Sequence, residues 1–157
     1  MIDFDDWRRN YDRLTCSEHV EFYRKVAEVY PEQQHYNELA VRMFLADCEG
    51  PVLEIGGWKG ELAAAVLPDF PGIPEWLNVE IAPQAITESA CTDPRYSVVV
   101  PPAFIWDADI DLEPYRTLVA SHVIEHLKRT DVVKLLNAIR HVDRMYVDAP
   151  LPTFPSR

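Results

Sequence analysis

The pattern of apolar and polar residues changes at about residue 50 of this chain, and the change predicts two regions. Before it, apolar residues recur at helical spacing; from Pro51 onward, short apolar runs alternate with helix-prone segments. Apolar runs of that length are typical of buried parallel strands, and the segments between them of crossover helices. The pattern therefore predicts an α/β fold, with a mostly parallel sheet that carries helices on both faces.

The expected elements can be placed by residue number. Strands are expected at 52–55, 76–81, 96–100, 118–121 and 145–148. Helices are expected at 61–67, where Pro68 ends the helix, at 83–89, and after a cap at Thr130. In the last helix the apolar positions at helical spacing, expected to face the core, are Val132, Val133, Leu136, Ile139 and Val142.

The first 50 residues are predicted to be helical. Thr15 and Glu18 have the spacing of a capping box, in which each side chain accepts from the other residue's backbone N–H. Leu39, Met43 and Phe44 continue an apolar stripe up to Gly50-Pro51. We expect residues 1–50 to form a helical cap on a core of residues 51–157; the cap either packs on the core alone or also covers a ligand.

Two of the apolar runs end in a carboxylate, Glu54 and Glu80. The first is followed by closely spaced glycines, Gly56, Gly57 and Gly60, and then by a helix-prone segment. Glycines let the backbone approach a ligand closely, and a carboxylate after the second strand can accept from both hydroxyls of a ribose. This layout predicts a nucleotide-type pocket at the carboxyl ends of the strands.

A third segment, Leu118-Val119-Ala120-Ser121-His122-Val123-Ile124-Glu125-His126-Leu127, narrows the choice. The three segments in this order resemble the Rossmann-like class I methyltransferases that use S-adenosylmethionine, over roughly Pro51 to Pro150. The resemblance implies that family's fold, its cofactor S-adenosylmethionine, and methyl transfer as the activity. The residues that it places around the cofactor are Glu54, Gly56, Gly57, Trp58, Gly60, Glu80, Ile81, Asp107, Ser121 and His122.

The resemblance also implies a role for each part of this set. Glu54 orders the glycine loop or holds the amino group of the cofactor, and Glu80 binds the ribose. Ile81 borders the adenine, and Asp107 lies near the adenine amino group. Backbone at Ser121 borders the methionine part of the cofactor, and His122 is the candidate general base wherever the acceptor must lose a proton.

Two departures from the family pattern keep another function open. Trp58 stands where the family has its middle glycine, so the indole either stacks over the cofactor or blocks its pocket. The family usually continues through a further helix and a closing hairpin, which a chain ending at Arg157 would lack. The last strand's edge would then be covered by the proline-rich tail or by a second copy, giving a homodimer. The alternative function is a methyltransferase-like domain that has lost catalysis and binds partners.

A third function class follows from the letters His122-Val123-Ile124-Glu125-His126, which form the His-x-x-Glu-His motif of inverted zinc peptidases. That interpretation needs the motif inside a helix, whereas the apolar run before it favours a strand end. It also needs a third ligand further along the chain. We therefore expect no metal site.

Composition bounds the partners. A chain of 157 residues with 48% apolar and 26% charged residues fits one soluble domain. Its formal net charge of −11 disfavours nucleic acid, so the acceptor is expected to be a small molecule, or else a protein. The acidic N-terminus is no secretory signal and no apolar run has membrane-spanning length, so we expect a cytoplasmic protein that binds no membrane. The three scattered cysteines are expected to be reduced.

Overall fold

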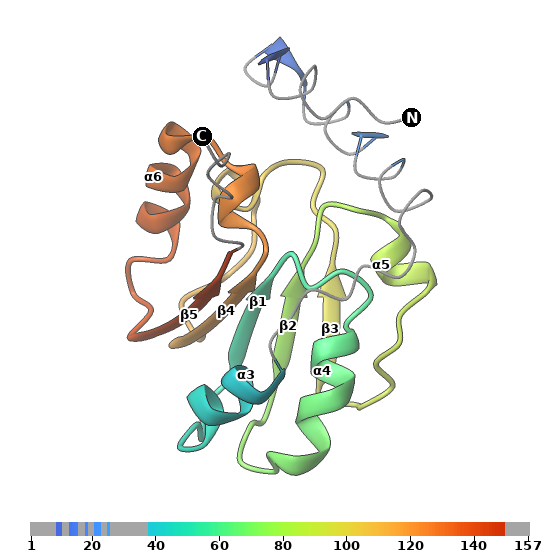
Figure 1. Ribbon diagram of the computed structural model, residues 1–157, viewed down its shortest axis with the longest axis vertical. Helices are drawn as coiled ribbons and strands as arrows, with labels where there is room; N and C mark the ends of the chain where they lie inside the picture. The colour runs from blue at the N-terminus through green and yellow to red at the C-terminus, as the bar shows by residue number, and fades with distance from the viewer. Residues whose placement is uncertain are drawn as a thin grey trace, which may run out of the picture.

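Five parallel strands form the centre of the computed structural model, in the order β3-β2-β1-β4-β5 (Figure 1). They are β1 (Val52–Ile55), β2 (Trp76–Val79), β3 (Tyr96–Val99), β4 (Thr117–Ser121) and β5 (Arg144–Asp148). The structure describes residues 38–149 and, before them, residues 9, 10, 13–15, 18, 21, 22 and 25. Because strand order reverses beside β1, the carboxyl ends of β1 and β4 flank the switch point where ligands bind in such sheets.

Helices lie on both faces of the sheet, as the sequence predicts. The helices α3 (Glu38–Leu45) and α4 (Glu61–Val66), with the short η2 (Leu67–Asp69), cover one face, and α6 (Arg129–Ala138) packs on the other. Shorter helices follow three strands: α5 (Gln84–Thr87) after β2, η3 (Ile105–Asp107) after β3 and η4 (Ile124–His126) after β4. The doubly wound α/β fold is therefore confirmed, with strand positions within two residues of those expected.

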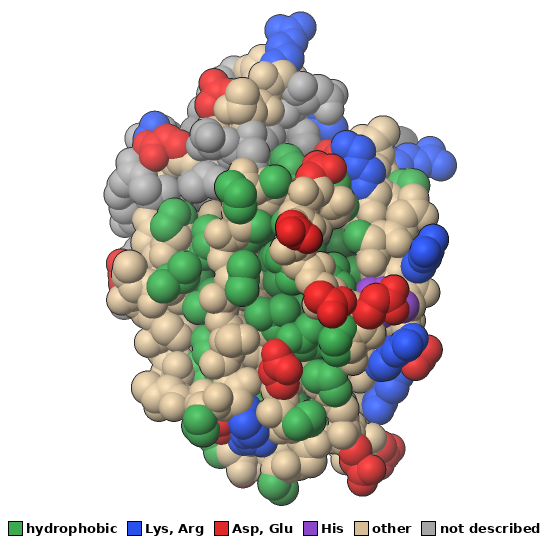
Figure 2. All heavy atoms as spheres, turned by 180° about the vertical axis from the view of Figure 1, so that it is seen from behind, with side chains coloured by type: hydrophobic (Ala, Val, Ile, Leu, Met, Phe, Trp, Pro, Cys, Tyr) green, Lys and Arg blue, Asp and Glu red, His purple; other side chains and the backbone are tan. Residues whose placement is uncertain are grey.

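Two apolar layers sandwich the sheet because side chains alternate along each strand. Val52 and Trp76 point into the layer under α3 and α4, and Leu53 and Leu118 point into the layer under α6. In the view from behind, hydrophobic side chains gather over the middle of the visible surface, with acidic side chains among them (Figure 2). In the part of the chain that the structure describes, no helix is long and apolar enough to cross a membrane.

The predicted buried faces of two helices are partly wrong. In α3, Leu39 and Met43 are 69% and 73% exposed, whereas Val41 and Leu45 are buried. In α6, Val133 and Leu136 are exposed and Leu135 is buried, whereas Ile139, directly after the helix, is buried as predicted. This helix also begins earlier than expected, with Lys128 and not Thr130 at its N-cap.

The N-terminal region is described at only a few positions. There the Thr15–Glu18 capping box is confirmed: the Thr15 N–H donates to Glu18 Oε2 at 2.7 Å, and the Glu18 N–H donates to Thr15 Oγ1 at 3.3 Å. Most of the predicted cap, and the tail from residue 150, lie outside the described residues. Since α3 shares an apolar layer with β1, residues 38–45 belong to the core. The boundary at residue 50 stays a prediction.

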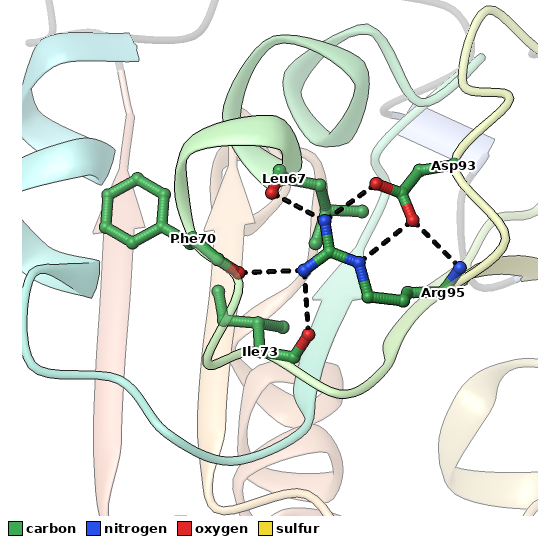
Figure 3. A network of polar contacts seen from close by, with 5 residues as sticks. All are labelled: Leu67, Phe70, Ile73, Asp93 and Arg95. Atoms are coloured by element: carbon green, nitrogen blue, oxygen red, sulfur yellow. Dashed lines mark hydrogen bonds and ion pairs between the residues drawn. The ribbon is translucent and has the colours of Figure 1, made fainter.

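Arg95, directly before β3, binds the backbone of η2 and the turn that leads to β2 (Figure 3). The Arg95 guanidinium donates to the carbonyl oxygens of Leu67, Phe70 and Ile73, at 2.6, 2.8 and 3.0 Å. It also pairs with Asp93 at 2.7 Å, and hydrogen bonds from Arg95 lower the pKa of that carboxyl to about 2. One side chain thus links three carbonyls of η2 and the turn after it, two of which, at Leu67 and Phe70, also accept from a backbone N–H.

Candidate cofactor site

The loop after β1 turns through three residues with left-handed backbone. The φ angles are 70° at Gly56, 48° at Trp58 and 78° at Gly60. Glycine adopts this conformation freely, whereas any other residue pays roughly 1–2 kcal/mol for it. Strain of this kind persists where the surrounding structure imposes it and is common at functional sites.

Neighbouring side chains press on the loop from several directions. A Cβ atom added to any of three glycines would overlap a neighbouring side chain. At Gly56 it would overlap Val123, at Gly57 the Glu54 carboxyl, and at Gly60 the Tyr96 hydroxyl. The Gly56 N–H donates to the Val79 carbonyl of β2 at 3.0 Å. The loop backbone is therefore held between side chains that come from β1, β3 and the segment after β4.

The buried side chain of Asn78 joins this loop to the sheet. Its Oδ1 accepts from the Gly57 N–H, and its Nδ2 donates to the Trp58 carbonyl and to the Tyr96 hydroxyl, each at 3.0 Å. Sequence analysis did not select Asn78. The signal was an amide residue inside an apolar strand, between Leu77 and Val79, where an unpaired polar group would be costly.

Glu80 follows β2 directly and is 8% exposed. Its Oε2 accepts from the Trp58 N–H at 2.9 Å, and its Oε1 accepts from the Ile81 and Ala82 N–H groups at 2.6 and 3.1 Å. Burial raises the pKa of Glu80 although these backbone donors oppose the rise. Since a carboxylate accepts about four hydrogen bonds, one acceptor position remains, on Oε2.

Glu54 lies deeper than Glu80, at 2% exposed, beneath the glycine loop. The Trp76 indole N–H donates to its Oε2 at 2.8 Å. Burial raises the pKa of Glu54 to about 7; the Trp76 hydrogen bond opposes this, and the charge of Glu80 adds to it. The structure thus places Glu54 as a support under Gly57.

On the β3 side, Ile81 is half-buried next to Glu80, and Asp107 is exposed at the end of η3. The neighbouring Trp106 stacks on Phe104, with ring centroids 4.7 Å apart. Its indole Nε1 is buried and has no hydrogen-bond partner among the described residues. A buried donor of this kind near the expected adenine position is a further candidate that sequence analysis did not select.

At the end of β4 the backbone again turns left-handed, at His122 with a φ of 56°. The His122 N–H donates to the Asp148 carbonyl of β5 at 2.7 Å, and its Nδ1 lies 3.1 Å from Glu125 Oε1. Because an ionised carboxylate only accepts, this contact favours the tautomer with hydrogen on Nδ1. Ser121 precedes His122 as the last residue of the strand.

This geometry does not support the zinc-peptidase alternative. His122 lies outside η4 with left-handed backbone, and His126 ends that three-residue helix. The two histidines are therefore not one turn apart on a single α-helix, as the motif requires.

The structure brings the residues after β1 and β2 into direct contact, and the Gly56–Val123 contact joins them to the segment after β4.

No protein-family model matches the sequence, and no curated protein is similar to it in sequence. Solved structures are similar in fold. The methyltransferase domain of bacterial CtHen1 has a TM-score of 0.61 at 16% identity, with 72% of this chain and 64% of that chain covered.

Two more solved structures agree with it. A putative S-adenosylmethionine-dependent methyltransferase from Listeria monocytogenes has a TM-score of 0.57 at 15% identity, with 76% of this chain and 57% of that chain covered. The mitomycin 7-O-methyltransferase MmcR has a TM-score of 0.62 at 21% identity, with 91% and 45% covered. The chain has the class I methyltransferase fold. It spans about three fifths of the length of the first two of these methyltransferases.

Proposed function

We propose that this chain is a methyltransferase that binds S-adenosylmethionine at the carboxyl ends of β1 to β4 and transfers its methyl group to a small molecule. The observation that carries the proposal is the contact between Glu80 and the glycine loop, through the Trp58 N–H at 2.9 Å. This contact supports a site in which a carboxylate able to hold a ribose lies beside glycine backbone that a ligand can approach closely. The methyltransferase fold supports the choice of cofactor.

The residues present fit the cofactor in two places. Glu80 Oε2 has an acceptor position for a ribose hydroxyl, and the buried Trp106 Nε1 is a donor without a partner among the described residues. Accepting from both ribose hydroxyls requires Glu80 Oε1 to release one backbone donor. The Ala82 N–H, at 3.1 Å, is the longer of its two contacts.

Bound S-adenosylmethionine supplies a methyl group on a sulfonium sulfur that is itself the leaving group. The chain holds and orients: Glu80 fixes the ribose, and Asn78 fixes the glycine loop. His122, which the Glu125 carboxylate orients, takes a proton from acceptors that must lose one. The main task of the chain is to align the acceptor atom with the methyl group and to exclude water.

The small-molecule acceptor is proposed from charge and from neighbours. A net charge of −11 repels a phosphate backbone. Among the similar structures, MmcR is named for mitomycin, and BpumL is a plantazolicin methyltransferase solved with S-adenosylhomocysteine.

One observation favours a second function, a domain that keeps the fold without catalysis. Trp58 places an indole in the glycine loop, in a strained left-handed conformation. If the indole fills the cofactor's place, the chain binds neither S-adenosylmethionine nor its product.

Calorimetric titration of the 157-residue chain with S-adenosylmethionine and S-adenosylhomocysteine tests the first proposal against the second. We expect micromolar binding of both, weakened by Glu80→Gln about tenfold or more because the amide offers a single acceptor oxygen. Glu113→Gln, an identical change at an exposed residue before β4, serves as the control and is expected to bind like the parent. Absence of binding to the parent protein would reject the methyltransferase proposal.

A further inference from the structure

We propose that two copies of this chain pair through β5 in antiparallel orientation, centred on Tyr146, so that one sheet continues across both copies. The proposal does not depend on methyl transfer. Among the described strands, β5 pairs with β4 alone and forms one edge of the sheet. An edge strand presents backbone donors and acceptors to any chain that can match them.

The direction of the backbone groups along β5 follows from its contacts with β4. The Asp148 carbonyl accepts from the His122 N–H, and the Arg144 N–H donates to the Arg116 carbonyl. Residues 144 and 148 therefore direct their backbone groups toward β4, and by alternation so does 146. The N–H and C=O groups of Met145 and Val147 then point away from the sheet.

Met145 and Val147, whose backbone groups point outward, have apolar and solvent-exposed side chains. Met145 is 46% exposed and Val147 is 41% exposed. They pair in register with Leu118 and Ala120, so they lie on the face that α6 covers further in. An edge strand kept apart from other chains usually carries charge or proline at such positions.

The strand Arg144-Met145-Tyr146-Val147-Asp148 is complementary to itself in one antiparallel register. Centred on Tyr146, that register sets Met145 of one copy opposite Val147 of the other, so each outward N–H faces an outward C=O. The same register sets Arg144 opposite Asp148. The β5 sequence thus matches apolar to apolar and cation to anion at once.

No neighbouring register does the same. A shift of one residue sets the outward groups of one copy against residues whose groups point inward. A shift of two residues restores the hydrogen bonds but moves Arg144 away from Asp148. Arg144 is also held beside the edge, because its guanidinium lies 5.0 Å from the centre of the Phe44 ring and donates to the Phe44 carbonyl.

Sedimentation velocity over a concentration series tests the pairing, with the parent chain and variants at one exposed position. We expect a monomer–dimer equilibrium with a micromolar dissociation constant, since paired short strands bury less area than a standard interface. Val147→Pro removes an outward N–H and leaves the bonds to β4 in place, and Val147→Lys adds a charge to the edge. Both variants are expected to be monomeric.

Val133→Lys, the same change at an exposed valine on α6, is the matched control and should retain the dimer. Circular dichroism of each variant separates loss of pairing from loss of folding. The proposal fails if the parent chain stays monomeric at all concentrations. It also fails if folded Val147→Pro and Val147→Lys remain dimeric.

Discussion

At the scale of single residues, the candidate site includes a carboxyl, that of Glu54, which is buried beneath the glycine loop. Glu54 has a pKa of about 7 in the fold, against 4.5 when exposed, chiefly because it is buried. Between these two pH values the folded state holds a proton that the unfolded state has lost. The contribution of Glu54 to stability is therefore full below pH 4.5, falls as pH rises, and levels off above pH 7.

This predicts a pH effect that one substitution removes. Glu54→Gln cannot ionise and keeps an oxygen for the Trp76 indole N–H. Relative to the parent, the variant should gain up to about 3 kcal/mol of unfolding free energy as the pH rises across this window. Urea unfolding at several pH values measures the difference. A constant difference between the two proteins would contradict the raised pKa.

A second prediction at this scale separates the strain at Trp58 from the role of its indole. Trp58→Gly and Trp58→Ala both delete the indole, but only glycine relieves the left-handed backbone, whose φ is 48°. The glycine variant should therefore be about 1 kcal/mol more stable than the alanine variant. Thermal unfolding compares the two, and equal stability would show that the backbone relaxes without cost.

The same two proteins test the indole against the cofactor. If the indole meets the pocket, both variants should change the dissociation constant of S-adenosylhomocysteine by a similar factor, whatever their stability. Dissociation constants identical to that of the parent would place the indole outside the site.

Sequence analysis was uneven among these residues. It selected Glu54 and Glu80 as carboxylates at the ends of apolar runs, and His122 from the family resemblance. It did not show that Glu80 already accepts from three backbone N–H groups, or that Asn78 fixes the loop. Such contacts depend on which strands become neighbours, and this is not encoded in local spacing.

At the scale of elements, strand positions were predicted well because a buried parallel strand is apolar along its whole length. Helix faces were predicted less well. In α3 the bulky Leu39 and Met43 are exposed, while Val41 and Leu45 enter the core. Several apolar residues on a short helix allow more than one face, and the packing of neighbours selects between them.

The Arg95 network gives a prediction at this scale. Arg95→Ala should lower the unfolding free energy by about 2–4 kcal/mol, because carbonyls of the turn before β2 lose a charged donor. The unfolding free energy of Arg95→Lys should lie between those of the parent and Arg95→Ala, since an ammonium lacks the planar arrangement of donors of a guanidinium. Urea unfolding measures both, with the exposed Arg140→Ala as control. A stability of Arg95→Ala equal to that control would contradict the role.

Acid should weaken the same network. The pKa of Asp93 is lowered from 3.8 to about 2, so its contribution is present above pH 3.8 and is lost as pH falls through about 2.

At the scale of the whole molecule, the sequence predicted the fold class but not the sheet order. Strand order depends on how each crossover returns to the sheet, which the residue pattern does not show. An edge at the last strand was expected from the sequence, but the structure was needed to show that Met145 and Val147 are the exposed apolar residues on it.

Net charge predicts how the proposed pairing depends on salt. Each copy carries −11, so the copies repel one another over long distances. Raising the salt concentration from about 10 mM to about 150 mM screens this repulsion and should tighten the dimer, although it weakens the Arg144–Asp148 pairs. Sedimentation at both concentrations measures the change; a weaker dimer at the higher salt would mean that these ion pairs dominate.

The crowding of the glycine loop has a consequence for mutational tolerance. Three of its five positions, Gly56, Gly57 and Gly60, already lie against other side chains and have no space for a methyl group. The other two, Trp58 and Lys59, carry large side chains. In a saturation library of this loop, replacements should therefore accumulate at 58 and 59. Sequence divergence of the loop is then confined to these two adjacent positions.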